Sequence, residues 1–299
     1  MLTTQKRALH HWTGHGIIAA MSTVAFGPGE RVGRYRLDAL LGEGATGLVY
    51  SASADGQRFA LKLLRPERAG ESVARARFLR EARLAQAIQS EYVVPILELG
   101  EADGLTYLVL PYYRGGSLAT RLRALGRLDL DWTPDLAAEL GRGLDALHDR
   151  AILHRDVKPS NVLLDDDGHG ALTDFGLARA ADSTRLTSDG QVLGTPHYLA
   201  PELIEGQEAT RASDVYALGC VLFECLAGEP PFAGRGLAEI GFAHLVEPPP
   251  DLRDRRPDLP DGLAEALLTA LEKSPSQRPT TATALARMLR VGRSCSPSR

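Results

Sequence analysis

Hydrophobic positions in the first third of the chain form short runs with turn residues between them. Five such runs predict strands, and they span Tyr35–Leu41, Leu48–Ser53, Arg58–Leu64, Pro95–Leu99 and Leu105–Leu110. Between the second and third runs, the pair Asp55-Gly56 predicts a tight hairpin, because such a turn needs positive φ angles that few residues adopt at low cost. The pattern therefore predicts a β-rich N-terminal region.

Helical periodicity dominates the rest of the chain, after one earlier helix expected at Ser72–Ile88. Thr133 followed by Pro134 predicts an N-cap and the first residue of a helix. The apolar face of that helix consists of Leu136, Leu140, Leu144 and Leu147. Further helices are expected at Asp214–Leu226, which is apolar enough to be buried, and at the surface at Leu263–Leu271 and Thr280–Leu289.

These elements predict an α+β fold with two lobes of unequal size. The predicted boundaries are an irregular extension over 1–34, a β-rich lobe over 35–110, a connection over 111–116, a helical lobe over 117–291 and a disordered tail over 292–299.

Composition narrows the classes of function. The 299 residues are 44% apolar and 24% charged, which suffices for two modest lobes around a cleft. The net charge of −4 gives no global positive field for nucleic acid. No apolar run approaches the roughly 20 residues of a membrane span. Three cysteines without a CxxC pair favour a reducing, cytoplasmic location.

A glycine-rich string lies between the first two predicted strands. Its residues are Gly42, Glu43, Gly44, Ala45, Thr46, Gly47, Leu48 and Val49. Glycines let backbone N–H groups approach phosphate oxygens without a Cβ in the way. A strand follows the string, whereas a dinucleotide-binding fold needs a helix there, so the Rossmann interpretation is excluded.

A lysine lies near the end of the third apolar run. Lys62 places an ammonium in a mostly apolar strand, where it must extend to solvent or be paired. Glu81, on the polar side of the helix that follows, is the predicted partner, although a solvated glutamate is the simpler interpretation of that residue alone.

The densest group of polar motifs begins at the string His154–Asn161, which reads HRDVKPSN. Asp174-Phe175-Gly176 and Ala200-Pro201-Glu202 follow, and Arg278 comes later. In this order, with the glycine string and the lysine before them, the motifs resemble the eukaryotic-like serine/threonine protein kinases, particularly the bacterial members. The resemblance covers Tyr35 to Leu289 and implies the two-lobed kinase fold.

The resemblance also implies transfer of the ATP γ-phosphate to Ser or Thr hydroxyls of proteins. Asp156 would accept the proton of the substrate hydroxyl, and Lys158 would neutralise charge on the transferring phosphoryl group. The Lys158 pattern and Thr195 are typical of serine/threonine kinases rather than tyrosine kinases.

Cation and nucleotide contacts are implied in the same way. Asn161 and Asp174 would hold Mg²⁺, or Mn²⁺ in its place. Lys62, paired with Glu81, would hold the α and β phosphates of ATP. The glycine string would cover the nucleotide, and the rest of the adenine pocket would consist of Leu41, Val49, Ala60 and Leu163, with Leu110 as gatekeeper and Tyr112 in the hinge.

Regulation and supporting contacts follow from the resemblance as well. Thr184, Thr187 and Ser188 are candidate phosphorylation sites in a polar stretch that Arg155, together with Arg179, would order by pairing with a phosphate, the alternative being a plain flexible loop. We also expect an ion pair of Arg278 with Glu202. Asp214 is expected to support the backbone of the His154-Arg155 turn.

Three classes of protein stay open at this point: a protein kinase, a nucleotide-binding pseudokinase scaffold and a small-molecule kinase with a related core. The chain has four Lys and a single Asn, yet Lys62, Lys158 and Asn161 all fall in the motifs, which favours an active enzyme. The expected partners are ATP and protein substrates, with a transient homodimer during autophosphorylation as a further option.

Overall fold

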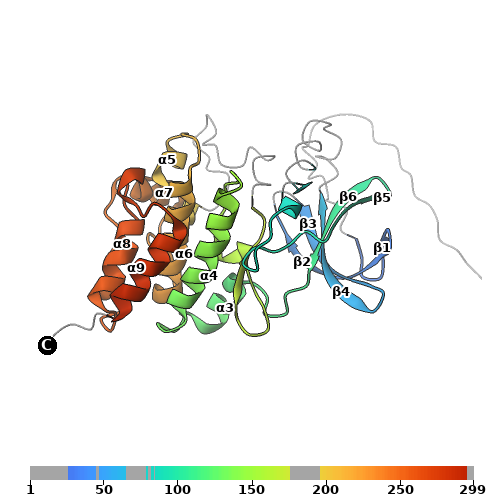
Figure 1. Ribbon diagram of the computed structural model, residues 1–299, viewed down its shortest axis with the longest axis horizontal. Coiled ribbons are helices and arrows are strands. Elements are labelled where there is room, and N and C mark those ends of the chain that lie inside the picture. Colours follow the sequence, from blue (N-terminus) through green and yellow to red (C-terminus); the bar gives the residue numbers. More distant parts are fainter. Residues whose placement is uncertain are drawn as a thin grey trace, which may run out of the picture.

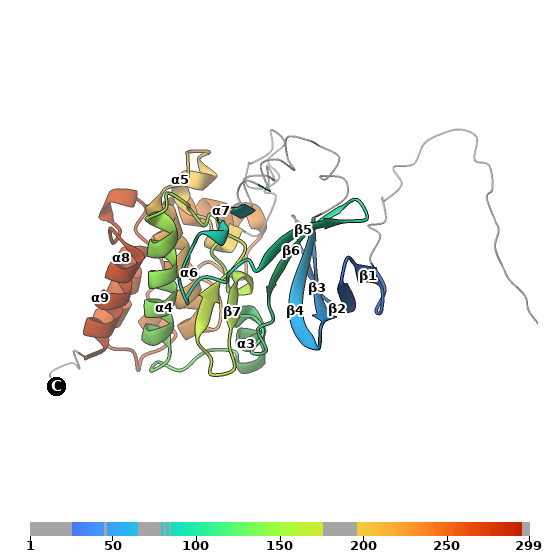
Figure 2. The ribbon, with the colours of Figure 1, turned by 45° about the vertical axis from the view of Figure 1, so that its right-hand side comes forward.

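Two lobes follow one another along the chain in the computed structural model, which describes residues 26–44, 47–64, 79, 82–83, 85–175 and 196–294. A β-sheet forms the N-terminal lobe, and helices form most of the C-terminal lobe (Figure 1). The lobes stay side by side when the view is turned (Figure 2). This is the predicted α+β architecture. No helix in the described ranges is long and apolar enough to cross a bilayer.

The N-terminal lobe contains a six-stranded antiparallel sheet in the order β1-β2-β3-β4-β6-β5. Its strands are β1 (Arg31–Val32), β2 (Tyr35–Glu43), β3 (Gly47–Ala54), β4 (Gln57–Leu64), β5 (Glu98–Ala102) and β6 (Leu105–Pro111). Four of the five predicted strands are confirmed by β2, β3, β4 and β6.

Two expectations for this lobe are wrong. The predicted strand Pro95–Leu99 overlaps β5 only at its end, because β5 is an edge strand with no buried side chain and the apolar run precedes it. The extension over 1–34 is not irregular throughout, since β1 pairs with β2 and buries Val32 completely.

Backbone geometry explains the turns of this sheet. The predicted hairpin between β3 and β4 is confirmed, with φ angles of 52° at Asp55 and 76° at Gly56. Gly47, at the start of β3, lies so close to β4 that a Cβ atom would come within 1.9 Å of the Leu63 carbonyl oxygen. The last glycine of the glycine string is therefore required by strand packing as well as by any ligand.

The C-terminal lobe consists mainly of helices around a small two-stranded sheet. Its helices are α3 (Leu118–Leu125), α4 (Thr133–His148), α5 (Pro201–Ile204), α6 (Arg211–Ala227), α7 (Leu237–Val246), α8 (Asp261–Ala270) and α9 (Ala282–Ser294), with short 3₁₀ turns η1 (Pro159–Asn161), η3 (Pro196–Tyr198), η4 (Leu252–Asp254) and η5 (Pro275–Gln277). The sheet pairs β7 (Val162–Leu164) with β8 (Gly170–Leu172).

Helices α4 and α6 form the centre of this lobe, and the structure confirms that both predicted segments are helical and buried. The leucines of α4 that were expected on one face, Leu136, Leu140, Leu144 and Leu147, are fully buried. Residues Ser213–Phe223 of α6 are buried as well. Both helices contribute to one apolar core that reaches β7 and β8, and this core fixes the loop between α4 and η1.

Two details of the helices differ from expectation. Thr133 is the first residue of α4 rather than its N-cap, because its hydroxyl donates to the Asp129 carbonyl instead of accepting from the helix. Helix α9 continues to Ser294, so the predicted tail begins too early. Gly292 is buried against Gly262 of α8, where a Cβ would lie 2.3 Å from the Gly262 backbone, and this contact holds the last turn of α9.

The predicted helix Ser72–Ile88 lies largely outside the described residues. Of its described positions, Leu79, Ala82, Arg83, Ala85 and Gln86 are helical, and the helix ends before the predicted Ile88. Ala82 and Ala85 are buried, as expected for its apolar face.

Candidate active site

Asp156 lies in the loop between α4 and η1, where its carboxylate meets two of the other predicted residues. Its Oδ2 atom is 2.8 Å from Nζ of Lys158 and accepts a hydrogen bond of 3.0 Å from Nδ2 of Asn161. Within the described part of the chain, no group hydrogen-bonds Oδ1. One carboxylate oxygen is thus held in place while the other can accept a proton.

Asn161 connects this loop to the segment after β8. Its side chain is 6% exposed, and Nδ2 donates to both the backbone oxygen and Oδ2 of Asp156. The backbone oxygen of Asn161 accepts from the N–H of Thr173, the residue before Asp174. Because Nδ2 of Asn161 donates to Asp156, the amide oxygen Oδ1 of Asn161 points away from that carboxylate.

Lys62 and Asp174 form an ion pair between β4 and the segment after β8. The distance from Nζ to Oδ1 is 2.6 Å, and the lysine side chain is only 3% exposed. Burial alone would raise the pKa of Asp174, but the charge and hydrogen bond of Lys62 hold the pKa below its ordinary value. Asp174 is therefore ionised at neutral pH. Glu81, the predicted partner of Lys62, lies outside the described residues.

The donor chemistry of Asn161 and Asp174 fits a hard divalent cation. Asn161 offers its amide oxygen, and Asp174 offers the carboxylate oxygen that Lys62 does not contact. Carboxylate and amide oxygens are the ligands that Mg²⁺ prefers, together with water and phosphate. Asn161 and Asp174 fill only part of the coordination shell of such a cation, so its remaining ligands would be other oxygens.

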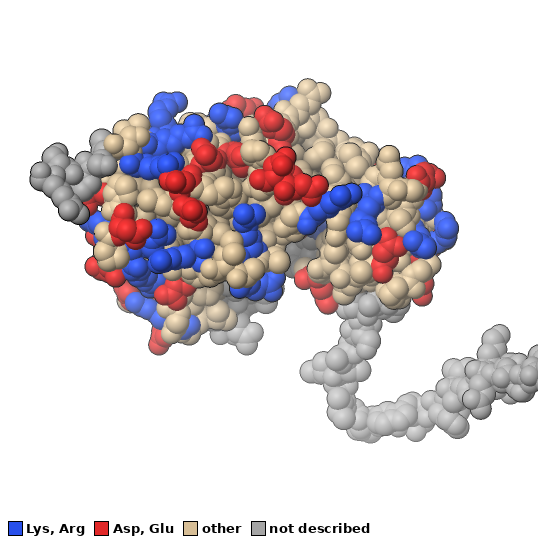
Figure 3. Space-filling model, turned by 90° about the horizontal axis from the view of Figure 1, so that it is seen from below, with Lys and Arg blue, Asp and Glu red and all other residues tan. Residues whose placement is uncertain are grey.

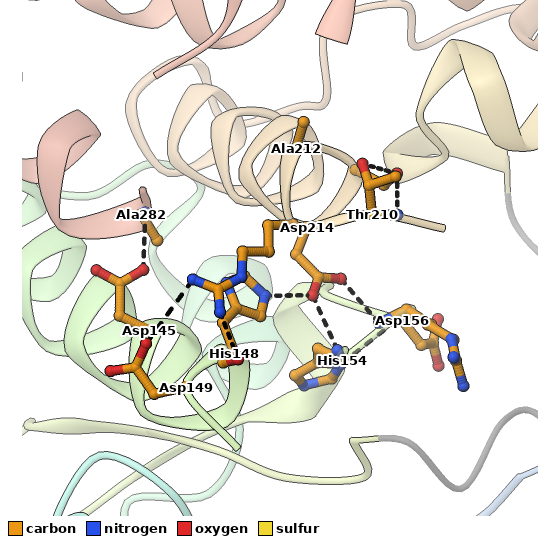
Figure 4. Close-up of polar contacts among 12 residues, drawn as sticks. Asp145, His148, Asp149, His154, Asp156, Thr210, Ala212, Asp214 and Ala282 are labelled. Atoms are coloured by element: carbon orange, nitrogen blue, oxygen red, sulfur yellow. Dashed lines mark hydrogen bonds and ion pairs between the residues drawn. The ribbon is translucent and has the colours of Figure 1, made fainter. Parts of the chain in front are cut away.

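We call the loop between α4 and η1 the catalytic loop, and one carboxylate from α6 holds its backbone (Figure 4). Asp214, 1% exposed, accepts from the N–H groups of His154 (2.9 Å) and Arg155 (2.8 Å). Arg155 has a φ of 68°, a conformation that costs a non-glycine residue free energy and needs such support. Oδ2 of Asp214 also meets Nε2 of His148 at 2.7 Å. The predicted support of this turn by Asp214 is confirmed.

His154 packs against Phe175. Its ring lies edge to face with Phe175 at a centroid distance of 6.3 Å. Burial lowers the pKa of His154 although Asp214 and two other carboxylates oppose the shift. The ring is thus neutral, and its Nδ1 accepts from the N–H of Asp156 at 3.4 Å.

An apolar cluster links the two lobes next to these polar groups. It brings together four of the residues predicted to line the adenine pocket, namely Val49, Ala60, Leu110 and Leu163. Val94, Ile96, Ala171 and Tyr113 complete the cluster, and sequence reasoning missed all four. Leu41 is 49% exposed at the end of β2, so this edge of the predicted pocket is open to solvent. Tyr112 lies beside the cluster with the guanidinium of Arg58 over its ring.

A buried ion pair anchors the segment after the predicted phosphorylation sites. Arg278 binds both carboxylate oxygens of Glu202 at 2.8 Å, as expected. Burial would raise the pKa of Glu202, but hydrogen bonds from Arg278 and Ser213 keep it below the ordinary value. Glu202 is therefore charged, and it fixes the start of α5.

Comparison with known proteins decides the family. The family described as "Protein kinase domain" matches residues 35–289. This chain belongs to the protein kinase family. Its relatives include serine/threonine-protein kinase PknA of Mycobacterium tuberculosis, which is 38% identical over 253 residues, with 82% of this chain and 58% of PknA covered. PknE of the same species is 38% identical over 255 residues, with 85% of this chain and 45% of PknE covered.

The solved kinase domain of M. tuberculosis PknI has the same fold. It is 28% identical, with a TM-score of 0.69, and 90% of this chain matches 99% of that structure. The kinase described here thus matches a whole kinase domain, whereas it spans about half the length of PknA and PknE.

Several predicted residues of this kinase lie outside the described ranges. They are Ala45, Thr46, Glu81, Thr184, Thr187, Ser188 and Thr195. Sequence reasoning also missed His148, which is 1% exposed at the end of α4. The signal was present, because His148 directly follows the last leucine of the apolar face of α4, where a polar residue must find a buried partner.

Proposed function

We propose that this chain is a serine/threonine protein kinase that transfers the γ-phosphoryl group of ATP to hydroxyls of protein substrates. The observation that carries the proposal is the contact of Asp156 with both Lys158, by an ion pair, and Asn161, by a hydrogen bond. The ion pair of Lys62 with Asp174 supports it. A pseudokinase scaffold would have no need to keep these charged groups in contact.

Asp156 would act as the base toward the substrate. The substrate hydroxyl oxygen forms a bond to the γ-phosphorus, the bond from that phosphorus to the β–γ bridging oxygen breaks, and ADP leaves with the electron pair. The hydroxyl proton passes to Oδ1 of Asp156, the oxygen that no described residue contacts. Such positioned base catalysis contributes about 10²- to 10⁴-fold.

The basic residues would stabilise the negative charge of the phosphates. Lys158 lies 2.8 Å from Asp156, so its ammonium is close to where the transferring phosphoryl group would meet the substrate hydroxyl. Lys62 would exchange part of its contact with Asp174 for the α and β phosphates. Catalysis of this kind depends on positioning and electrostatics rather than on covalent chemistry.

Asn161 and Asp174 would hold the divalent cation, with Mg²⁺ the proposed ion and Mn²⁺ a substitute. When bound, the cation neutralises charge on the phosphates. The ionised state of Asp174, maintained by Lys62, prepares this position before nucleotide arrives. Adenine would enter the apolar cluster of Val49, Ala60 and Leu163.

Regulation by phosphorylation of Thr184, Thr187 or Ser188 is the finer part of the proposal. Arg155 is held beside Asp156 by Asp214, where it could bind a phosphate group and order the polar stretch. Mass spectrometry of the active enzyme tests this part. Absence of phosphate between Gly176 and Thr195 would remove it.

The proposed setting is the cytoplasm, with ATP and protein substrates as partners. Cys220 and Cys225 are buried free thiols in α6, and burial raises the pKa of both. Unoxidised thiols of this kind are compatible with a reducing compartment. A transient dimer during autophosphorylation remains part of the proposal.

The substrate class is tested with γ-labelled ATP and three peptide pools that contain Ser, Thr or Tyr as the only hydroxyl residue. We expect labelling of the Ser and Thr pools and little labelling of the Tyr pool. Labelling of small hydroxylated metabolites without labelling of any peptide pool would instead favour the small-molecule kinase.

A further inference from the structure

A cavity of about 440 Å³ lies at the hinge, next to the apolar cluster of Val49, Ala60 and Leu163, with which it shares Tyr113 and Ala171. Its walls come from the hinge residues 111–114, the loop at 91–92, Glu139 of α4 and the turn between β7 and β8. We call it the hinge cavity. Its volume falls within the range of about 300–1,000 Å³ that is usual for ligand pockets.

Acidic side chains outnumber basic ones in the hinge cavity. Four carboxylates, those of Glu91, Glu139, Asp165 and Asp166, face two basic side chains, Arg114 and His169. Seen from below, acidic side chains gather close to the junction between the lobes (Figure 3). The cavity therefore presents a surplus of negative charge to a ligand.

The carboxylates of the hinge cavity differ in whether other residues of the chain already bind them. Glu139 is satisfied, since its carboxylate accepts from His169 at 2.6 Å and from the Gly170 N–H at 2.7 Å. By contrast, Glu91 and Asp166 are exposed and make no ion pair with any other residue in the described ranges. These two carboxylates are available to a positively charged partner.

Aromatic rings form much of the remaining wall, and two of them already hold a guanidinium group of this chain over one face. The guanidinium of Arg142 lies 5.5 Å from the ring centroid of Tyr92. That of Arg58 lies 5.2 Å from the ring of Tyr112. Both rings thus take part in cation–π contact on one face, so the guanidinium of a partner would stack on the opposite face, and arginine makes such contacts more often than lysine.

From these contacts we propose that the hinge cavity is a docking site for an arginine-bearing segment of a partner protein. A guanidinium is planar, so it can stack on a tyrosine ring while its N–H groups bind a carboxylate in the fork geometry. The available carboxylates of Glu91 and Asp166 and the ring of Tyr92 supply both kinds of contact. A compact lysine ammonium offers charge but no plane to stack.

The test uses the full chain and a fluorescein-labelled hexa-arginine peptide, with fluorescence anisotropy as the readout. A non-hydrolysable ATP analogue and Mg²⁺ occupy the nucleotide cleft, and the peptide has no hydroxyl to phosphorylate. Binding is therefore measured independently of phosphotransfer, and its failure leaves the proposed function standing. A hexa-lysine peptide of the same charge is the ligand control.

Two variants with the same change in net charge separate the cavity from general attraction. E91Q/D166N removes the available cavity carboxylates, whereas E208Q/D254N removes two exposed carboxylates elsewhere. We expect the first to weaken hexa-arginine binding by at least about fivefold and the second by less than about twofold. Y92L, which removes a wall ring, is expected to weaken binding as well, and thermal melting confirms that each variant is folded.

Three results would overturn the proposal. They are an equal loss of binding in both double variants, unchanged binding in E91Q/D166N, and hexa-lysine binding as tightly as hexa-arginine. The first would indicate attraction by net charge alone, the second another binding surface, and the third a site for ammonium groups or polyamines.

Discussion

The Nζ atom of Lys62 lies 2.6 Å from Oδ1 of Asp174, so a buried lysine of β4 is ion-paired with the acid that follows β8. Each lobe contributes one member of the pair. The contact keeps Asp174 ionised and holds the lysine beside the residues that would bind the cation.

Replacing Lys62 by Met should therefore abolish most activity. We expect kcat/KM for phosphotransfer to fall at least about 100-fold, since a lost hydrogen bond to a charged group costs about 1.5–3 kcal/mol and both Asp174 and the phosphates are affected. Lys273→Met is the matched control, because Lys273 is half-buried and bonded to backbone oxygens in the C-terminal lobe. It should lower Tm and leave kcat/KM of the folded protein within about twofold.

Asp214→Asn tests the support of the catalytic loop. The amide can accept only one of the two backbone N–H groups that the carboxylate oxygens hold, so the strained turn at Arg155 should lose order. We expect kcat to fall by about 10- to 100-fold, with KM for ATP nearly unchanged. Steady-state kinetics with a peptide substrate measures both values.

Asp145 offers a control of the same chemistry. This α4 carboxylate also accepts from two backbone N–H groups, those of Ala282 and Thr283, but at the start of α9 (Figure 4). Asp145→Asn should lower Tm without changing kcat. An equal loss of kcat in both variants would argue that Asp214 acts through global stability alone.

The pair of Arg278 and Glu202 should be a large contributor to stability. Both side chains are buried, at 0% and 4% exposure, so Glu202→Gln leaves a buried guanidinium without its counter-charge. We expect the free energy of unfolding in urea to fall by about 3 kcal/mol. Asp135→Asn, which removes the partner of Arg290 in an exposed pair, should change it by less than about 0.5 kcal/mol. Similar small values for both would contradict the assignment.

Acid should destabilise the fold through His244. Burial lowers the pKa of this histidine to about 3, below the ordinary 6.5 that applies in the unfolded chain. The unfolded state thus binds the proton first, and the free energy of unfolding falls as pH drops from about 6.5 toward 3. Between pH 7 and 5 the loss from this group is about 2 kcal/mol.

Urea melts of His244→Gln at both pH values test this expectation, because the variant should lose less stability on acidification than the parent. His169→Gln is the control. Its histidine is exposed and Glu139 raises its pKa, so its contribution has the opposite sign. If His244→Gln showed the full acid loss, the histidine would have to be protonated in the folded state.

Much of the fold was predictable because the polar and apolar patterns were strong. The paired strands β2, β3, β4 and β6 each carry an apolar run, and α4 has leucines on one face that become its buried side. The edge strand β5 was not predictable from such a run, since none of its side chains is fully buried. The 3₁₀ turns and the end of α9 depend on tertiary contacts such as that of Gly292 with Gly262.

Contacts in the site were predictable only between residues that lie close together in the sequence. Residues close together in a motif, such as Asp156 and Asn161, lie in contact because a short loop limits their separation. The contact of Lys62 with Asp174 bridges 112 positions of sequence, and only the packing of the two lobes determines it. His148 was missed for the same reason, because its partner Asp214 comes from another helix.

The most direct test of the central claim compares the parent chain with Asp156→Asn in γ-labelled ATP and Mg²⁺. Nucleotide binding is measured in parallel by thermal shift. We predict that both proteins bind nucleotide, and that only the parent transfers label to Ser or Thr residues, as mapped by mass spectrometry. Nucleotide binding without transfer by the parent, or equal transfer by Asp156→Asn, would contradict this account.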